Sequence, residues 1–368
     1  MSKNSKDIVF VAAKRSAIGR YKGIYKDLQA HNLGSLVIKS LIEKTKLKVD
    51  EIDEVILGQV LTGSCGQNPA RQAAINSGIP KEKTAIIINQ VCGSGLRSIV
   101  NGYQSILTSS ANFIIAGGQE SMTNSIHDQM MKDGLTDAFY NYHMGVTAEN
   151  VAAKYNISRQ EQDEFALVSQ QKANIAINKK KFDDEIINDD IDEHPRNGIT
   201  INDLSKLNSV FKEKGTVTPG NSSGINDGAA AVVLTKRELA EKHNLEILGK
   251  IISWATCGVD PSMMGLGPIP SSNRALEIAK WNVKDLDLIE INEAFAAQSI
   301  AVIKELKIPQ EKVNVNGGAI ALGHPIGASG ARIVVTLLHE LKKISGKKGL
   351  ATLCIGGGMG ISMCIEKD

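Results

Sequence analysis

The sequence predicts an α/β protein built from two similar halves, and three observations lead to this prediction. Segments that read as buried strands alternate with segments whose apolar residues recur at helical spacing, a pattern typical of α/β proteins. A weak internal repeat pairs an early part of the chain with its last part. Glycine occurs 34 times whereas aromatic residues make up only 4% of the chain. That composition predicts an aliphatic core with many tight turns.

The repeat has three paired steps, each with a strand that leads into a turn or a helix. The paired segments are 53–60 with 287–294, 86–100 with 313–335, and 113–122 with 349–360. Ligands of open α/β sheets bind beyond the carboxyl ends of the strands. Equivalent loops of the two halves would therefore form one shared site. The alternative is a chance similarity between α/β segments.

Residues 123–225 differ in character from both halves. They are rich in Asn, Asp, Lys and Gln, they include an amphipathic helical pattern over 158–181, and their charge run at 179–193 reads as a solvated face. We interpret this region as an insertion that covers a site. The predicted domains are an N-terminal half (1–122 and 226–246), a loop domain (123–225) and a C-terminal half (247–368).

Composition excludes several classes of protein. The 42 basic and 40 acidic residues of this 368-residue chain nearly cancel, which gives no indication of a nucleic acid or a membrane surface as partner. The chain starts without an apolar targeting segment and contains no run of about 20 apolar residues, so we expect a cytoplasmic protein. Its five cysteines form no CxxC pair, which argues against a disulfide framework and a structural metal.

The stretch NQVCGSGL at 89–96 places one cysteine at a junction between a strand and a helix. The preceding residues 85–88 read as a buried strand, and the residues from Leu96 to Ile106 have helical spacing. Cys92 would then lie near the unpaired N–H groups and positive dipole end of the helix, which stabilise a thiolate. The alternative is a small apolar residue in a tight turn.

Four other stretches could carry chemistry. They are INEAFAAQ around Asn292, GGAIALGHPIGASGAR around His324, LCIGGGMG around Cys354, and YHMGVTAENVA around His143 in the insertion. Taken singly, His324 could be a turn histidine, Asn292 a cap and Cys354 a buried strand residue. GGGMG does not fit the GxGxxG fingerprint of dinucleotide-binding folds, which disfavours a dehydrogenase. Taken together, most of these stretches occupy loop ends of the two repeats.

The chain resembles the thiolase family, and in particular the biosynthetic thiolases that form acetoacetyl-CoA. The motifs that carry the resemblance are VCGSG, NEAFAAQ, NxNGGAIALGHPIGASGAR, CIGGGMG, PARQAAINSGIP and SWATCGVDPSMMGLGPIP. They are long, they occur in the family's order, and the match runs nearly end to end. The resemblance implies the thiolase fold, in which two α/β halves pack as five αβαβα layers with an inserted loop domain.

The resemblance also implies roles for the site residues. Cys92 would be the nucleophile that takes an acyl group from a thioester, and His324 would deprotonate it. Cys354 would be a second acid and base that removes the α-proton of the incoming acetyl-CoA. Asn292, holding a water, and the His324 imidazole would stabilise the enolate oxygen. The backbone N–H groups of Cys92 and Gly356 would form a second oxyanion hole for the tetrahedral intermediate.

Coenzyme A binding would involve the insertion and the thioester end of a tunnel. The residues implied are His143, Met144, Leu135, Phe211, Ser223, Gly224, Ala294, Phe295 and Ile326. Leu135, Met144 and Ile326 could also be ordinary core residues.

Two departures from the family matter. About fifteen residues are absent between SMTN (121–124) and MMKDGLTDAFY, where relatives carry a loop that helps form the tetramer, and a shorter gap lies around 186–195. In addition, LNSVF at 207–211 lacks the Arg-Pro that relatives place before Phe211. An adenine-stacking arginine is thus missing at that place, which leaves Phe211 as the remaining contact.

The expected reaction is the condensation of two acetyl-CoA to acetoacetyl-CoA and CoA, or the reverse. The nearest alternative is a degradative 3-ketoacyl-CoA thiolase with longer substrates, which the His143–Met144 pair disfavours because it would limit the depth of the tunnel. A non-catalytic acyl-binding protein would have lost one of Cys92, His324 or Cys354, and a cysteine hydrolase would not need Cys354. No cofactor besides the coenzyme A thioester substrate is expected, and the resemblance implies a homotetramer built as a dimer of dimers.

Overall fold

The strands of the computed structural model form one twisted sheet made of two half-sheets. The structure describes residues 4–368, so residues 1–3 of the predicted N-terminal half lie outside the described residues. The strand order is β4-β3-β5-β6-β1-β7-β10-β9-β8, with β2 paired to β6. The strands are β1 (Ile8–Arg15), β2 (Gly19–Arg20), β3 (Glu54–Gly58), β4 (Thr84–Ile88), β5 (Ile114–Ser121), β6 (Asn226–Lys236), β7 (Gly249–Gly258), β8 (Leu288–Ile291), β9 (Lys348–Ile355) and β10 (Met359–Glu366).

The internal repeat is confirmed by the pairing of these strands. In the first half β4, β3 and β5 are parallel, and β6 and β1 follow as antiparallel neighbours. In the second half β8 and β9 are parallel, and β10 and β7 follow antiparallel. Val313 pairs in parallel with Ile289 of β8 and so takes the place that β4 has beside β3. The halves meet where Val9 and Phe10 pair with β7.

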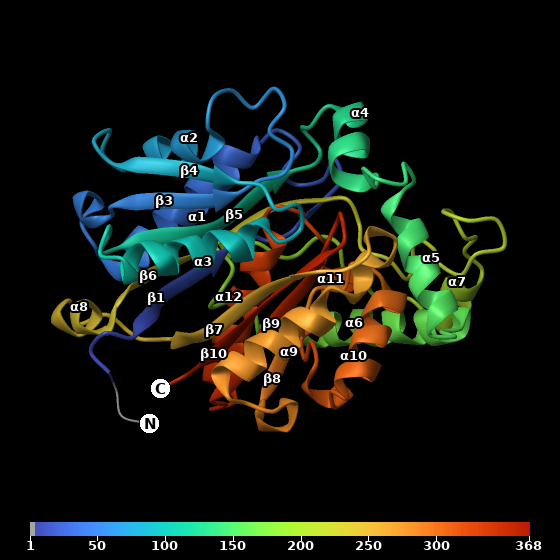
Figure 1. The fold of residues 1–368 in the computed structure, drawn as a ribbon. Coiled ribbons are helices and arrows are strands. Elements are labelled where there is room, and N and C mark those ends of the chain that lie inside the picture. The colour runs from blue at the N-terminus through green and yellow to red at the C-terminus, as the bar shows by residue number, and fades with distance from the viewer. Residues whose placement is uncertain (1–3) are drawn as a thin grey trace.

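Helices and sheets alternate in five layers, as expected from the resemblance. Helices α3 and α12 pack against each other between the half-sheets, α1 and α2 cover the outer face of the first half, and α9 and α10 cover that of the second (Figure 1). The helices of the halves are α1 (Ala30–Thr45), α2 (Pro69–Asn76), α3 (Ser94–Leu107), α8 (Arg237–Lys242), α9 (Pro268–Ala279), α10 (Ala296–Leu306), α11 (Ala319–Leu322) and α12 (Ser329–Lys343), with short 3₁₀ turns at Val49–Glu51, Pro261–Leu266, Val283–Asp285 and Gln310–Lys312.

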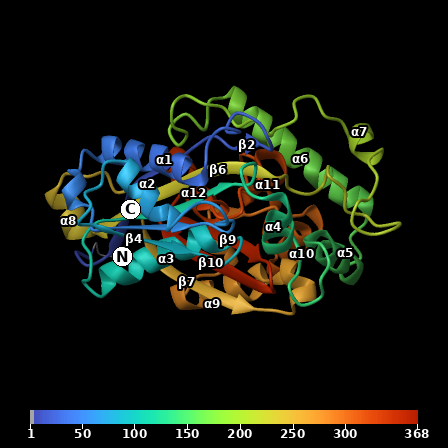
Figure 2. The same cartoon turned by 90° about the horizontal axis from the view of Figure 1, so that it is seen from above.

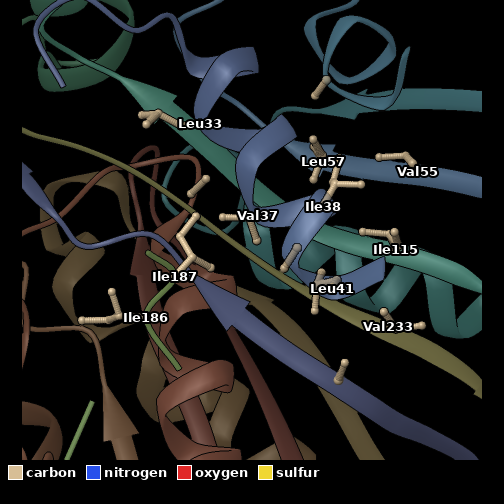
Figure 3. Packing of buried hydrophobic residues seen from close by; sticks show 14 of the residues in the cluster. Leu33, Val37, Ile38, Leu41, Val55, Leu57, Ile115, Ile186, Ile187 and Val233 are labelled. Atoms are coloured by element: carbon tan, nitrogen blue, oxygen red, sulfur yellow. The ribbon is translucent and has the colours of Figure 1, made fainter. Parts of the chain in front are cut away.

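The aliphatic core predicted from composition is present. Leu33, Val37, Ile38 and Leu41 line one face of α1 and pack onto residues of β3, β5 and β6 (Figure 3). The spacing of these four residues is that of one helical face. The core of the first half therefore consists of α1 pressed against its sheet.

The region 123–225 lies along one side of both halves, and Figure 2 shows its long helix at the end of the molecule away from α8. It contains α4 (His127–Gln129), a π-helical turn (Met130–Leu135), α5 (Met144–Lys154), α6 (Arg159–Asn178) and α7 (Ile201–Ser205). The amphipathic pattern at 158–181 thus forms α6, whose N-cap Ser158 makes a capping box with Glu161. The division into three domains stays a prediction.

The charge run at 179–193 is a solvated face only in part: Lys179, Lys180, Asp183, Asp184 and Asp189 are exposed, whereas two of its carboxylates are not. Glu185 and Asp192 are buried, at 1% and 4% exposure. Their carboxylates contact the buried Arg15 guanidinium of β1 at 2.6 and 2.7 Å. A buried charge needs a partner of opposite sign, and that partner lies far away in the sequence. The run therefore ties the inserted region to the first half.

No helix within residues 4–368 combines the length and the apolar character that crossing a membrane requires.

Candidate active site

Cys92 lies in a sharp turn between β4 and α3, as the sequence predicted. The helix begins at Ser94, and the preceding Val91 has a φ of 46°, a left-handed conformation that is rare for a β-branched residue. A Cβ on Gly93 would lie 2.4 Å from the Ile355 side chain. The turn therefore needs a glycine after Cys92, and it directs the thiol toward the end of β9.

The expectation that this turn stabilises a thiolate is wrong for the resting protein. Burial raises the pKa of the Cys92 thiol to about 11, although the backbone amides of Gly356 and of Cys92 itself lower it. The free-energy cost of removing a thiolate from water is larger than the stabilisation that two N–H groups and a helix N-terminus provide. The same two amides face the Cys92 sulfur, however, which is where an oxyanion hole for an acyl group on that sulfur would have to be.

His324 is held in an orientation that leaves one ring nitrogen available. Its Nδ1 lies 2.6 Å from the Ser329 hydroxyl, and that hydroxyl donates to the Pro325 carbonyl at 2.9 Å. Because the single hydroxyl proton is used there, Ser329 accepts from Nδ1–H, and Nε2 carries the free lone pair. Burial lowers the pKa of His324 to about 3. The imidazole is therefore neutral at physiological pH, as a base must be.

Asn292 lies behind His324 and is fully buried. Its Nδ2 is 3.5 Å from Nδ1 of His324. The NEAF loop around it is fixed by the Glu293 carboxylate, which accepts from the Ser169 hydroxyl at 2.7 Å and from Asn314 Nδ2 at 2.8 Å. Asn314 belongs to the NxNGG motif, so a hydrogen bond links this motif to the NEAF loop.

Cys354 is the last residue but one of β9, and Gly356 follows directly after the strand. Cys354 is 1% exposed. Its pKa is raised by burial and further by the neighbouring Cys92, because two thiolates side by side would repel each other. Gly357 and Gly358 have φ values of 83° and 81° and turn the chain into β10. The GGGMG stretch is thus a hairpin turn, in agreement with the absence of a dinucleotide fingerprint.

One cavity of about 410 Å³ brings the predicted residues together. Every site residue named from the sequence lines it except Asn292. The members are Cys92, Leu135, His143, Met144, Phe211, Ser223, Gly224, Ala294, Phe295, His324, Ile326, Cys354 and Gly356. Sequence reasoning missed further lining residues, which are Val91, Met122, Met131, Gly134, Arg196, Pro219, Ser222, Ile225 and Met264. The missed residues are mostly apolar, and nothing in the sequence distinguishes them from core residues.

Aromatic rings form one wall of this cavity. The His143 ring stacks on Phe211 with centroids 4.5 Å apart, and Phe211 meets Phe295 edge to face at 6.3 Å. A Cβ on Gly145 would lie 2.2 Å from the Phe211 ring, so the glycine of YHMG makes room for that ring. His143 accepts from the Gly145 amide through Nδ1 at 3.0 Å. Phe211 therefore forms part of the cavity wall together with His143 and Phe295.

Glu120, which sequence reasoning missed, joins the loops of the two halves. Its buried carboxylate accepts backbone N–H bonds from Val60 at 2.9 Å, Leu61 at 3.2 Å and Gly327 at 2.9 Å. Burial raises its pKa to about 7. Gly327 belongs to the loop that carries His324 and Ile326, so this carboxylate fixes that loop relative to the end of β3. Its place in the repeat, at the end of β5, is the signal that could have identified it.

Within residues 4–368, no His, Cys, Asp and Glu side chains are grouped as a metal site would require.

Comparison with known proteins identifies the family. The thiolase N-terminal domain matches residues 8–129 and 124–238, and the thiolase C-terminal domain matches residues 245–367. The chain belongs to the thiolase family. Among the relatives of this thiolase, the acetyl-CoA acetyltransferase of Rhizobium meliloti is 52% identical over 387 residues and covers 98% of both chains. The cytosolic acetyl-CoA acetyltransferase of the rat is 47% identical and covers 100% of both.

Solved structures agree with this assignment. The acetyl-CoA acetyltransferase of Bacillus anthracis superposes on this thiolase with a TM-score of 0.96 at 40% identity, and the match covers 100% of both chains. Human mitochondrial 3-ketoacyl-CoA thiolase in complex with CoA gives a TM-score of 0.95 at 41% identity over 99% of this chain and 98% of that one. The thiolase fold is therefore confirmed.

The break in the N-terminal match coincides with the first departure noted in the sequence. The two matched pieces overlap at residues 124–129, which is where the sequence predicts a segment shorter than in relatives. In this thiolase that stretch is short and leads from Ser121 at the end of β5 through α4 into the π-helical turn.

Proposed function

We propose that this thiolase is an acetyl-CoA acetyltransferase, which condenses two acetyl-CoA to acetoacetyl-CoA and CoA and catalyses the reverse thiolysis. The observation that carries the proposal is the cavity that holds two thiols, Cys92 and Cys354, beside one neutral imidazole, His324. A hydrolase would need only one thiol, whereas carbon–carbon bond formation needs a nucleophile and a separate carbon-acid base. The relatives with this name cover the chain over its whole length.

In the first half-reaction Cys92 becomes acetylated. His324 Nε2 takes the thiol proton as the sulfur attacks the thioester carbonyl carbon, and the amides of Cys92 and Gly356 stabilise the oxyanion. The thiolate of coenzyme A then leaves and takes its proton from Cys354. This leaves an acetyl-cysteine together with an imidazolium and a Cys354 thiolate, so no net charge is created in the apolar cavity.

In the second half-reaction the Cys354 thiolate removes an α-proton from the second acetyl-CoA. Burial raises the pKa of Cys354, which makes its thiolate a stronger base than an exposed one. The enolate oxygen is stabilised by the His324 imidazolium, and by Asn292 through a water. The enolate carbon attacks the acetyl-cysteine, acetoacetyl-CoA leaves, and the Cys92 thiolate recovers its proton from His324.

Replacing Cys354 tests this assignment because the two half-reactions should separate. Cys354→Ser should still accept an acetyl group on Cys92, more slowly because the leaving thiolate lacks its acid. It should fail to exchange the α-protons of acetyl-CoA with deuterated solvent and fail to release acetoacetyl-CoA, because a serine hydroxyl is a poor base. Intact-mass spectrometry and proton NMR measure the two steps. Condensation at the wild-type rate by Cys354→Ser would refute the proposal.

Acetyl specificity has its own test. The His143–Phe211–Phe295 wall narrows the cavity, which favours a short acyl chain over the substrates of a degradative 3-ketoacyl-CoA thiolase. We expect kcat/KM for thiolysis to fall from acetoacetyl-CoA to 3-ketooctanoyl-CoA. In a tunnel with room for the longer chain, each buried methylene would add about 1 kcal/mol or more of binding free energy. A rise along this series would identify the degradative enzyme.

Localisation, partners and assembly complete the proposal. We propose a cytoplasmic enzyme that needs no metal and no cofactor besides its coenzyme A thioester substrates, and that has neither nucleic acid nor membrane partners. The near balance of charges and the two mammalian relatives named cytosolic support this. We also propose a homotetramer built as a dimer of dimers, as the resemblance implies.

A further inference from the structure

Among residues 4–368, Arg196 is the only permanently charged side chain that lines the catalytic cavity. The other lining residues are apolar or neutral, apart from His143 and His324, whose pKa values are both lowered by burial. No aspartate or glutamate of the described part of the chain lines it. An apolar cavity of this kind gains nothing from one cation unless the bound molecule carries a negative charge.

Arg196 is partly exposed and lines more than one hollow of the protein. It also borders two shallow surface depressions, one with Arg20, Tyr21 and Glu193 and the other with Gln171 and Asn174. Neither depression reaches Cys92 or Cys354. Arg196 therefore lines both the catalytic cavity, whose wall also includes Ser223 and Gly224, and the hollows next to it.

The backbone of Arg196 is fixed while its guanidinium keeps most of its donors. The Arg196 amide donates to Gln170 Oε1 at 2.8 Å, and the Arg196 carbonyl accepts from Asn174 Nδ2 at 3.3 Å. The guanidinium makes one long bond, from Nη2 to the Pro219 carbonyl at 3.4 Å. In the part of the chain that the structure describes no carboxylate pairs with it, whereas Arg20 pairs with Glu193 at 3.1 Å.

We propose that Arg196 binds a phosphate group of the nucleotide end of coenzyme A and so makes the enzyme selective for phosphorylated thioester carriers. A guanidinium is the side chain that best matches phosphate oxygens, because its parallel N–H donors form charge-assisted bonds. The thioester of the same molecule then reaches inward to Cys92. This inference rests on the proposed function. It adds a residue that distinguishes coenzyme A thioesters from thioesters that carry no phosphate.

The test compares two acetyl donors that differ only beyond the pantetheine arm. Wild-type enzyme and Arg196→Gln are mixed with acetyl-CoA or with acetyl-pantetheine, which has no phosphate, and acetylation of Cys92 is followed by intact-mass spectrometry. With acetyl-CoA, Arg196→Gln should lower the second-order rate constant by about tenfold to a hundredfold, the loss expected for a charge-assisted bond. Its limiting rate at saturation should not change. With acetyl-pantetheine the two proteins should react equally.

Two further variants complete the experiment. Arg196→Lys keeps the positive charge but lacks the parallel N–H donors of a guanidinium. With acetyl-CoA it should therefore react faster than Arg196→Gln and more slowly than wild type. Arg20→Gln removes a neighbouring arginine that is already ion-paired, and should behave as wild type with both donors. Equal loss with both donors in Arg196→Gln, or no loss with either, would overturn the inference. A wild-type protein that neither donor acetylates would instead refute the proposed function.

Discussion

At the scale of single residues, the reactive groups are kept uncharged until substrate arrives. Cys92 follows a strained turn and precedes a helix, yet burial raises its pKa to about 11, and burial lowers that of His324 to about 3. The pair is therefore a neutral thiol and a neutral imidazole over the whole physiological range. Proton transfer between them must accompany the attack on the thioester, because no resting thiolate exists.

This neutrality predicts a flat pH profile for acetylation. Below about pH 11 the Cys92 thiol keeps its proton, and above about pH 3 the His324 imidazole lacks one, so neither group titrates between pH 6 and 9. The first-order rate of Cys92 acetylation at saturating acetyl-CoA should vary by no more than about threefold across that range, whereas a group titrating within it would change the rate about tenfold per pH unit. Rapid-quench mass spectrometry gives the rate.

His324→Ala is the control for that profile. It should slow acetylation by about 10²–10⁴-fold, as expected for the loss of a general base, and its residual rate should rise with pH as free thiolate takes over. A wild-type profile with a midpoint near pH 6.5 would contradict the neutral pair and indicate an exposed, ordinary imidazole.

At the scale of elements, the site depends on the close approach of α3 and α12. A Cβ on Gly95 would lie 2.8 Å from the backbone nitrogen of Ala331, and one on Gly330 would lie 2.4 Å from that of Leu96. Gly95 of α3 and Gly330 of α12 thus lie where the backbone of the opposite helix comes too close for a side chain. Cys92 and His324 lie shortly before the starts of these two helices, so the spacing of the helices sets the spacing of the reacting groups.

Gly95→Ala should therefore damage both stability and chemistry. Its methyl group would clash with backbone atoms, which cannot move aside as a flexible side chain can. Overpacking of this kind lowers the free energy of unfolding by about 1–3 kcal/mol. We expect a melting temperature lower by several degrees and a slower acetylation of Cys92. Thermal unfolding and intact-mass kinetics measure the two effects.

Gly102→Ala, on the same helix, is the matched control. There the nearest atoms to an added Cβ are side-chain carbons of Ile114, Leu234 and Ala116 at 3.1–3.3 Å, which can shift, and alanine also favours a helix over glycine. It should be clearly less harmful than Gly95→Ala. If the two variants behaved alike, the backbone contact between α3 and α12 would not be what constrains the site.

At the scale of the whole molecule, the sheet has one open edge within the described residues. At the β8 end Val313 pairs with Ile289 and closes the ladder, but β4 pairs with β3 alone. The prediction that this strand is buried is wrong for the structure, because no residue of β4 is buried and Ile86 is 44% exposed. Such exposure is a liability for a free edge strand and suits an edge that another subunit covers. Cys92 follows this strand by four residues, so the proposed assembly would support the nucleophile's turn.

Ile86→Lys should weaken the assembly, because a lysine on an edge strand opposes pairing between edges. Light scattering coupled to size exclusion should show an oligomer for the wild type and a smaller species for this variant at the same concentration. Ile278→Lys replaces a similarly exposed isoleucine on α9, in the outer layer of the other half, and should leave the mass unchanged. An unchanged mass in Ile86→Lys would exclude β4 from the interface.

The sequence alone determined much of this protein. The period of its apolar residues predicted the α/β class, and the pairing of 53–60 with 287–294 and its companions predicted two equivalent halves. The motifs around Cys92, His324 and Cys354 predicted a shared site, and the structure places these three residues in one cavity. These features are local or repeated, and local chain chemistry suffices to show them. The amphipathic helix α6 with its Ser158 cap belongs to the same class.

Only the tertiary structure decided what depends on burial and on distant partners. A pKa follows the environment of a group, so the dipole at the start of α3 suggested a thiolate where desolvation keeps a thiol. Glu185 and Asp192 read as solvated charges because their partner Arg15 lies far away in the chain. Glu120 and Arg196 stand in no motif, and their surroundings become visible only when loops from both halves and the insertion meet. Sequence records which groups are present, whereas folding decides which of them share a space without water.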